Sequence, residues 1–198
     1  MDKYRNFVFD VNGVLLDGPS AISMFTRFYD IPSDIHKEFI KYNKQMFRTN
    51  QYEEAYLVFN KTLNHFGIEG DLEKNKVMFT EIFNAEEIIE GVKEIVTELK
   101  AKGFNLYILS NEFRARTLIS EVRFKDFFDM FDGAVYGWKE GMYKPDIRMW
   151  ETIIQRYHID PKLSVYVDDK EENREIGSNF GFTVFESVEE MNNKFNII

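Results

Sequence analysis

The chain has 198 residues, of which 44% are hydrophobic and 30% charged, as is typical of one globular domain or a domain with a modest insertion. With 25 basic against 34 acidic side chains, the net charge is −9, which argues against binding to nucleic acid or anionic membranes. The absence of cysteine excludes disulfides, thiol catalysis and cysteine-ligated metals. No apolar run reaches the roughly 20 residues of a membrane span, and the first residues contain no apolar signal-peptide core. We therefore expect a cytoplasmic protein with no membrane partner.

The first predicted element is a short strand at residues 7–9, whose Phe- and Val-rich run ends at Asp10. From about residue 20 to residue 85 the apolar side chains recur at helical spacing, which predicts three or four helices and no strand. The aromatic members of this pattern, which we expect to form a Phe-rich core, are Phe25, Phe28, Tyr29, Tyr52, Tyr56, Phe59 and Phe66.

Strands and helices alternate in the rest of the chain. The predicted strands cover residues 104–109, 134–136, 163–167 and 182–185, and helices are predicted around residues 92–99, 114–122, 147–157 and 172–180. This alternation predicts an α/β fold with a parallel sheet and right-handed crossovers. The helical block between the first strand and the others has the pattern of an inserted domain.

Polar side chains follow several of the predicted strands. They are Asp10, the pair Ser110 and Asn111, and the pair Asp168 and Asp169, while Lys144 precedes Pro145 and Asp146 at a predicted helix start. Taken singly, each is an ordinary turn or helix-cap signal. Ligands of parallel α/β sheets bind at the carboxyl ends of the strands, so the ordered set predicts one site.

The residue types indicate the chemistry of this site. Three carboxylates brought together repel one another unless a hard cation binds them, and Mg²⁺ is the cation that we expect. A lysine and a hydroxyl beside that cation suit a phosphoryl group. An aspartate at the strand end can then act as a nucleophile and form an aspartyl-phosphate.

Four motifs in this order resemble those of the haloacid dehalogenase-like superfamily of phosphotransferases. They are residues 9–17, residues 109–111, residues 144–146, and residues 167–169 with Asn173. The resemblance covers nearly the whole chain and implies a Rossmann-like core at residues 1–17 and 89–198. The block at residues 18–88 resembles the helical cap of the phosphoglucomutase-like and phosphatase-like members.

The resemblance also implies a role for each matching residue. Asp10 would be the nucleophile and a Mg²⁺ ligand, joined by the backbone carbonyl of Asn12 and by Asp169. Asp168 would be a ligand or lie just behind the ligands, and Asn173 would orient water around the metal. Ser110 and Lys144 would bind the phosphoryl oxygens, helped by backbone N–H groups near Val11, Asn12 and Asn111.

One position departs from the family pattern, which has aspartate two residues after the nucleophile to protonate the leaving oxygen and then activate water. Asn12 stands there in this chain, and an amide cannot replace a general acid–base that is typically worth 10²–10⁴-fold. The protein is then a slow phosphatase, or one in which Glu112, His36 or His65 supplies the proton. It is otherwise a catalytically impaired phosphate- or protein-binding member, or Asn12 is an engineered substitution.

The function predicted from the sequence is Mg²⁺-dependent hydrolysis of a small phosphate monoester through an aspartyl-phosphate on Asp10. The expected partner is a small phosphorylated metabolite, and the sequence specifies neither a protein partner nor an oligomeric state. A phosphomutase is an alternative enzyme, but it also needs a proton shuttle, so Asn12 counts against it equally.

Overall fold

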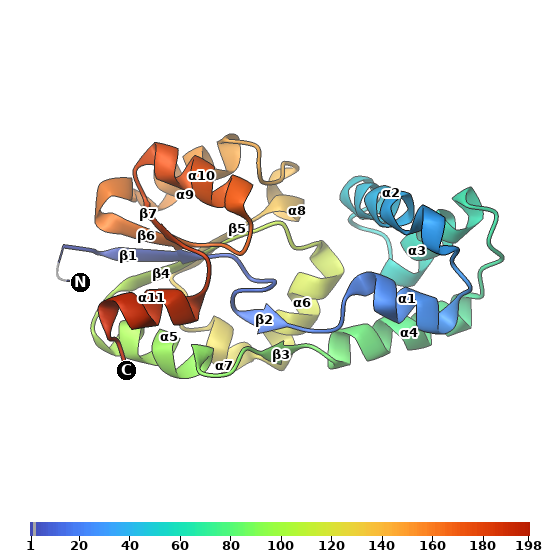
Figure 1. Ribbon diagram of the computed structural model, residues 1–198, viewed down its shortest axis with the longest axis horizontal. Helices are drawn as coiled ribbons and strands as arrows, with labels where there is room; N and C mark the ends of the chain where they lie inside the picture. Colours follow the sequence, from blue (N-terminus) through green and yellow to red (C-terminus); the bar gives the residue numbers. More distant parts are fainter. Residues whose placement is uncertain (2) are drawn as a thin grey trace. The chain divides into compact units, whose positions relative to one another are not determined.

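The structure is a computed structural model that describes residues 1 and 3–198. The contacts within it divide the chain into two compact units, both visible in Figure 1. The first unit contains residues Met1–Asp17, Ile88–Glu112 and Glu121–Ile198, and the second contains Gly18–Glu87 and Phe113–Ser120. Each unit has a hydrophobic core of its own.

A five-stranded parallel sheet with the strand order β5-β4-β1-β6-β7 forms the centre of the first unit. Its strands are β1 (Asn6–Phe9), β4 (Asn105–Ser110), β5 (Gly133–Tyr136), β6 (Ser164–Val167) and β7 (Thr183–Phe185). All the predicted strands are confirmed, each to within one residue at either end. In the register of the sheet Phe9 lies beside Ile108 and Val167, so the residues that follow these strands meet at one edge.

Helices cover both faces of this sheet because successive strand residues point to opposite sides. Phe7 and Phe9 pack with α5 (Val92–Ala101), α7 (Lys125–Phe128) and α11 (Val188–Phe195). Val8 faces the other way, toward α9 (Arg148–Tyr157) and α10 (Glu171–Phe180), as Figure 1 shows. The sheet is therefore the middle layer of three, and its strand ends are left for function.

The second unit is helical, as predicted. Its elements are α1 (Ala21–Phe28), the short 3₁₀ helix η1 (Ser33–Ile35), α2 (His36–Thr49), α3 (Ala55–His65) and α4 (Leu72–Asn84). Phe25, Phe39 and Phe59 are buried in its core, with rings packed edge-to-face or tilted. The expectation for Tyr52 was wrong, because this residue lies in the turn after α2 and is 72% exposed.

Two helices of this unit begin at side chains that accept hydrogen bonds from the free backbone N–H groups of the first turn. At α1, Ser20 Oγ accepts from the N–H of Ser23 at 3.3 Å. At α4, Asp71 Oδ1 accepts from the N–H groups of Glu73 and Lys74 at 2.9 and 3.1 Å. Local sequence thus determines where these helices start.

The segment Phe113–Ser120 belongs to the helical unit although it follows β4 of the sheet. It contains most of α6 (Arg114–Arg123). The ring of Phe113 packs on those of Phe47 and Phe83, with centroids 4.6 and 6.2 Å apart. Aromatic packing between residues so distant in sequence leaves no periodic pattern, which is why the sequence analysis placed this segment in the core.

Several short elements were not predicted from the sequence. They are the paired strands β2 (Leu16–Asp17) and β3 (Glu87–Ile88), and the helices α7, α8 (Gly137–Glu140), η2 (Pro161–Leu163) and α11. Most are too brief to show a periodicity.

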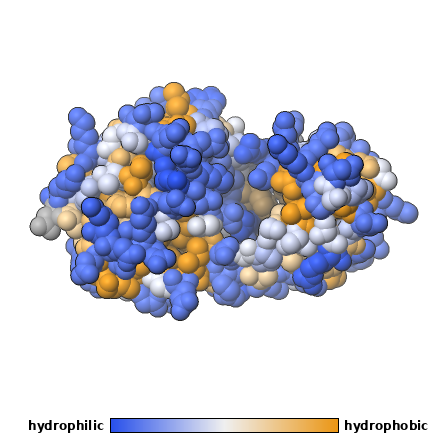
Figure 2. Space-filling model, viewed as in Figure 1, coloured by the Kyte–Doolittle hydropathy of each residue, from blue (hydrophilic) through white to orange (hydrophobic). Residues whose placement is uncertain are grey.

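Figure 2 shows hydrophilic side chains over most of the face in view. In the described residues, no helix is long and apolar enough to cross a bilayer.

Candidate active site

The loop after β1 carries Asp10 and folds back on itself in a tight turn. The backbone N–H of Asp10 donates to the carbonyl of Val167 at 2.9 Å, which ties the loop to β6. Gly13 in this loop has φ +80°, and a Cβ there would lie 3.3 Å from the carboxyl group of Asp169. Glycine therefore lets the loop approach the Asp169 carboxylate closely, at a backbone conformation that other residues rarely adopt.

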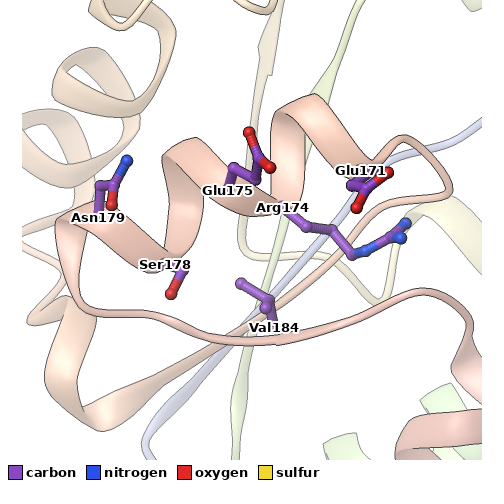
Figure 3. A pocket seen from close by; sticks show the side chains of 6 residues that line it. All are labelled: Glu171, Arg174, Glu175, Ser178, Asn179 and Val184. Carbon is purple, nitrogen blue, oxygen red and sulfur yellow. The ribbon is translucent and has the colours of Figure 1, made fainter.

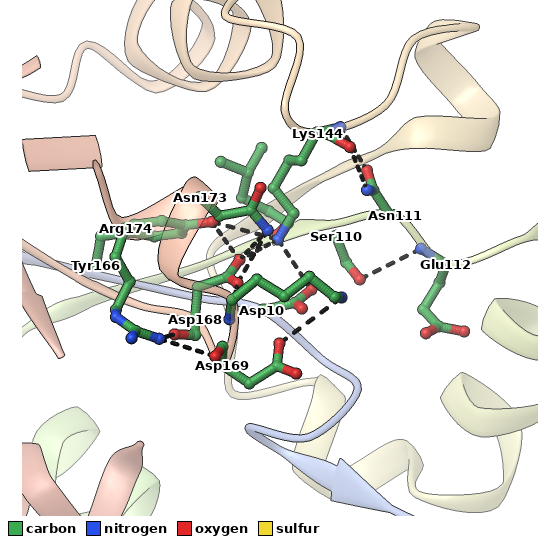
Figure 4. A network of polar contacts seen from close by, with 12 residues as sticks. Asp10, Ser110, Asn111, Glu112, Lys144, Tyr166, Asp168, Asp169, Asn173 and Arg174 are labelled. Atoms are coloured by element: carbon green, nitrogen blue, oxygen red, sulfur yellow. Dashed lines mark hydrogen bonds and ion pairs between the residues drawn. The ribbon is translucent and has the colours of Figure 1, made fainter. Parts of the chain in front are cut away.

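Lys144 lies at the centre of the polar network in Figure 4 and is almost completely buried. Its Nζ is 2.6 Å from Asp168 Oδ2 and 3.1 Å from Asp10 Oδ1, and it donates to the carbonyl of Leu109 at 2.7 Å. The Asn111 side chain holds the Lys144 backbone from both sides, accepting from its N–H at 2.6 Å and donating to its carbonyl at 2.7 Å. Two sequence motifs thus meet in one pair of hydrogen bonds.

Lys144 lies in the turn before helix α9, which begins at Arg148, one residue after the predicted start. Asp146 lies in the same segment and accepts hydrogen bonds from the backbone N–H and the side chain of Arg148, at 3.0 and 2.9 Å. The lysine is therefore positioned by the turn and by Asn111 rather than by a helix.

The charges of Lys144 and its two carboxylates stabilise one another. Burial by itself lowers the pKa of Lys144, but the charges of Asp10 and Asp168 outweigh this effect and raise it. Burial raises the pKa of Asp168, but the Lys144 ammonium and the hydrogen bonds to this carboxylate prevail and lower it. The ammonium and the Asp168 carboxylate are therefore both charged at neutral pH.

Asp168 is fully buried, and donors within the chain bind both of its oxygens. Oδ1 accepts from the Lys170 backbone and from Asn173 Nδ2, each at 2.9 Å. Oδ2 accepts from Lys144 and from the hydroxyl of Tyr166. The sequence analysis missed Tyr166, because its place in a buried strand predicts a packing role.

The carboxylates of Asp10, Asp168 and Asp169 each have an oxygen within 4.8 Å of the others. Partial burial raises the pKa of Asp169, and the charges of Asp10 and Asp168 add to this shift. In the described residues, the buried Oδ1 of Asn173 has no hydrogen-bond partner. An all-oxygen donor set with a buried acceptor beside it fits a hard divalent cation and its water.

Ser110 is the last residue of β4, and Glu112 follows it at the same edge of the sheet. Ser110 is buried, and its Oγ accepts from the backbone N–H of Glu112 at 3.3 Å. The Glu112 carboxylate points away from Asp10 and Lys144 in Figure 4. Burial raises the pKa of Tyr136 on β5, and the charges of Glu121 and Glu112 add to the shift.

Arg174 on α10 is a second residue that the sequence analysis missed. Its guanidinium donates to the backbone carbonyls of Asp168 and Asp169, both at 2.8 Å, and so holds the turn that carries the two acids.

A surface pocket on the other side of Arg174, shown in Figure 3, is lined by Glu171, Arg174, Glu175, Ser178, Asn179 and Val184. Its lining combines charges of both signs with one apolar side chain and contains none of the predicted site residues.

A family profile described as haloacid dehalogenase-like hydrolase matches residues 4–181 of the chain. The protein belongs to this family. The predicted family and the Rossmann-like α/β fold class are thereby confirmed.

Two curated relatives illustrate the range of this hydrolase family. The chain is 24% identical over 188 residues to mouse acyl-CoA dehydrogenase family member 10, of whose length it spans 17%. It is 22% identical to the sesquiterpene phosphatase astK of Aspergillus oryzae, where the match covers 86% of this chain and 83% of the relative. Only the second relative is of similar length.

Two solved bacterial structures illustrate the similarity in fold. A haloacid dehalogenase-like family hydrolase from Porphyromonas gingivalis superposes with a TM-score of 0.76 at 18% identity, covering 98% of each chain. A family enzyme from Bacteroides thetaiotaomicron, solved with magnesium and inorganic phosphate, gives a TM-score of 0.72 at 15% identity over 92% of this chain and 93% of the other. At these identities the likeness establishes the fold.

Proposed function

We propose that this hydrolase is a phosphatase that cleaves a small phosphorylated metabolite through an aspartyl-phosphate on Asp10, with Mg²⁺ as its cofactor. The observation that carries the proposal is the position of the Asp10 carboxylate, at the carboxyl edge of the sheet and 3.1 Å from the buried Lys144 ammonium. The sesquiterpene phosphatase among the relatives, and the magnesium and phosphate bound to the Bacteroides enzyme, support the same chemistry.

In this proposal Asp10 attacks the phosphorus atom, and Lys144 offsets the repulsion between the carboxylate and the anionic substrate. The Lys144 ammonium is available for this role because Asp168 and the carbonyl of Leu109 hold it in place. The Ser110 hydroxyl, together with the backbone N–H groups near Val11, Asn12 and Asn111, would bind the phosphoryl oxygens. The Ser110 hydroxyl lies at the end of β4, and the backbone N–H groups come from the loops that follow β1 and β4.

The Mg²⁺ ion would be held by Asp10, Asp169 and the backbone carbonyl of Asn12. Asp168 is less suited to direct ligation because its oxygens already accept hydrogen bonds from Lys144, Tyr166, Asn173 and the Lys170 backbone. Asn173 would accept a hydrogen bond from water near the ion through its buried Oδ1. When bound, the ion would neutralise part of the carboxylate and phosphoryl charge.

The helical block at residues 18–88 would act as a cap that excludes water and selects the substrate.

One observation favours a second candidate function, that of a binding protein that no longer hydrolyses its ligand. Asn12 is exposed in the loop beside Asp10, where a carboxyl would serve as the general acid–base. This alternative keeps phosphate binding and loses hydrolysis.

The test is a rapid-mixing time course with p-nitrophenyl phosphate and Mg²⁺, following nitrophenolate from the first turnover. This leaving group needs little protonation, so we expect a burst near one product per site and then a slow phase. Asp10→Asn has to abolish the burst, EDTA has to suppress it, and the matched surface variant Asp126→Asn has to retain it. A burst that survives in Asp10→Asn would contradict the nucleophile, and phosphate binding without a burst would favour the binding protein.

A further inference from the structure

We infer that this site is specific for phosphoryl compounds whose leaving group departs as a stable anion. These are acyl phosphates, diphosphates, and enol or aryl phosphates, as opposed to phosphates of aliphatic alcohols. The inference rests on the proposed phosphatase function and names its substrate class. It follows from the proton-carrying groups around Asp10, each of which is engaged elsewhere or lacks a proton to give.

The reaction shows where a proton donor matters. An oxygen of Asp10 forms a bond to phosphorus, the bond from phosphorus to the leaving oxygen breaks, and that oxygen keeps the electron pair. An alkoxide needs a proton at that moment, and a general acid supplies typically 10²–10⁴-fold. A carboxylate, a phosphate or a phenolate leaves as the anion. Water then cleaves the aspartyl-phosphate, restoring the Asp10 carboxylate and releasing phosphate, with the proton passing to solvent.

The charged neighbour of Asp10 is poorly placed to supply that proton. The Lys144 ammonium donates hydrogen bonds to Asp168, to the carbonyl of Leu109 and to the Tyr166 hydroxyl, at 2.6, 2.7 and 3.3 Å. Its Nζ also lies 3.1 Å from Asp10 Oδ1, as an ion pair. A substrate oxygen can share this cation, but proton loss would leave two buried carboxylates without their counter-charge. Lys144 is thus a binding group and not an acid.

Of the other ionisable groups of the network, the buried ones are closed off, and the exposed Lys170 ammonium is paired with Asp169 at 3.7 Å. Asp168 and Tyr166 are completely buried, and the Tyr166 hydroxyl already donates to Asp168. Asp169 belongs to the carboxylate group that we assign to the cation. The exposed side chain in the loop after Asp10 is Asn12, whose carboxamide neither gives nor takes a proton at neutral pH.

Three residues elsewhere in the chain are candidates for a substitute acid, and each has other contacts. The Glu112 carboxylate points away from Asp10 in Figure 4. His36 Nε2 donates to the carbonyl of Ile31 at 2.8 Å. The ring of His65 stacks on Tyr42, with centroids 3.8 Å apart and planes 6° from parallel. The two histidines are therefore engaged within the helical unit, and Glu112 is turned away from Asp10 within the sheet unit.

The test compares kcat/KM for substituted phenyl phosphates, from p-nitrophenyl to p-methylphenyl, with acetyl phosphate and ethyl phosphate as the two extremes. The ratio kcat/KM reports the phosphorylation of Asp10, even where the second step limits turnover. We expect a steep fall as the leaving group becomes more basic, and no measurable cleavage of ethyl phosphate. Intact-protein mass spectrometry after an acid quench should show one added phosphoryl group with acetyl phosphate.

Two variants at one position distinguish proton transfer from other effects. Asn12→Asp should raise kcat/KM for the poorest leaving groups by about 10²–10⁴-fold more than for acetyl phosphate, so the dependence becomes shallow. Asn12→Ala has to keep the steep dependence, because neither side chain carries a transferable proton.

The outcomes separate this inference from the function on which it rests. A shallow dependence in the unmodified protein, with ethyl phosphate cleaved in an Asp10-dependent way, would show that another residue supplies the proton. It would overturn the inference and leave the phosphatase intact. If neither acetyl nor p-nitrophenyl phosphate reacts and no phosphoryl group is added, the proposed function fails and the inference with it.

Discussion

Each unit of the molecule contains a cluster of buried charges, and the two clusters differ in their balance. In the sheet-edge cluster, the carboxylates of Asp10, Asp168 and Asp169 lie around one buried ammonium, that of Lys144. In the helical-unit cluster, Glu86 forms an ion pair with Arg116 and also accepts from the Ser120 hydroxyl at 3.0 Å. The first has an excess of negative charge, whereas the second pairs one anion with one cation.

The difference indicates which cluster is functional. A balanced pair whose anion also accepts a hydrogen bond from Ser120 needs no further charge, and it joins α6 to the end of the helical unit. Excess charge at a strand edge costs stability unless a ligand compensates for it, and such arrangements concentrate at functional sites. The sheet-edge cluster is therefore the one that we expect to respond to Mg²⁺ and phosphate.

The largest effect should come from Lys144→Met, because it leaves Asp10 and Asp168 buried without their counter-charge. We expect the free energy of unfolding to fall by about 3–5 kcal/mol and the p-nitrophenyl phosphate burst to disappear. Urea unfolding in EDTA measures the first effect. The exposed Lys93→Met on α5 is the control, and equal midpoints for the two variants would contradict the buried ion pair.

The next effect concerns the balanced cluster. Glu86→Gln should lower the free energy of unfolding by about 3 kcal/mol, at the low end for a buried pair because the Arg116 side chain is 17% exposed. The p-nitrophenyl phosphate burst amplitude at a temperature where the variant is folded should stay at one per site. The exposed Glu69→Gln serves as the matched control. A selective loss of the burst would show that this cluster acts on the reaction as well as on stability.

Tyr166→Phe probes how the sheet-edge cluster is positioned. It removes the hydroxyl that donates to Asp168 and should cost about 1.5–3 kcal/mol of stability, since the acceptor is charged. We also expect weaker binding of inorganic phosphate, measured by titration calorimetry, because Asp168 then orients Lys144 less firmly. Tyr107→Phe, on the same face of the sheet, is the control. Unchanged phosphate affinity in Tyr166→Phe would restrict this hydroxyl to a structural role.

The smallest effect is expected at helix starts whose capping side chains belong to neither cluster. Asp71→Ala at α4 and Ser187→Ala at α11 each remove a side-chain acceptor for first-turn N–H groups. Each should cost about 1 kcal/mol in thermal or urea unfolding and leave the kinetics unchanged. A change in kinetics from Asp71→Ala alone would indicate that the helical unit contributes to the reaction through its internal order.

The sequence by itself determined the layout of the first unit. Runs of Phe, Val, Leu and Ile bounded by polar residues were enough to place every strand of the sheet to within one residue at either end. Parallel strands then bring Asp10, Ser110 and Asp168 to one edge, because in such a sheet all carboxyl ends lie on the same side. The order of these residues in the sequence, and their spacing relative to the strands, therefore predict that they lie close together.

Only the tertiary structure decided how these side chains are used. Tyr166, on a strand, donates a hydrogen bond to the Asp168 side chain, and Arg174, on a helix, donates to the Asp168 backbone carbonyl. Asn111, in another loop, accepts a hydrogen bond from the backbone N–H of Lys144. The same holds for Phe113, which packs in the helical unit although the chain reaches it directly from the sheet. Hydrogen bonds and ring packing between residues far apart in sequence have no period, so they are settled only when the chain folds.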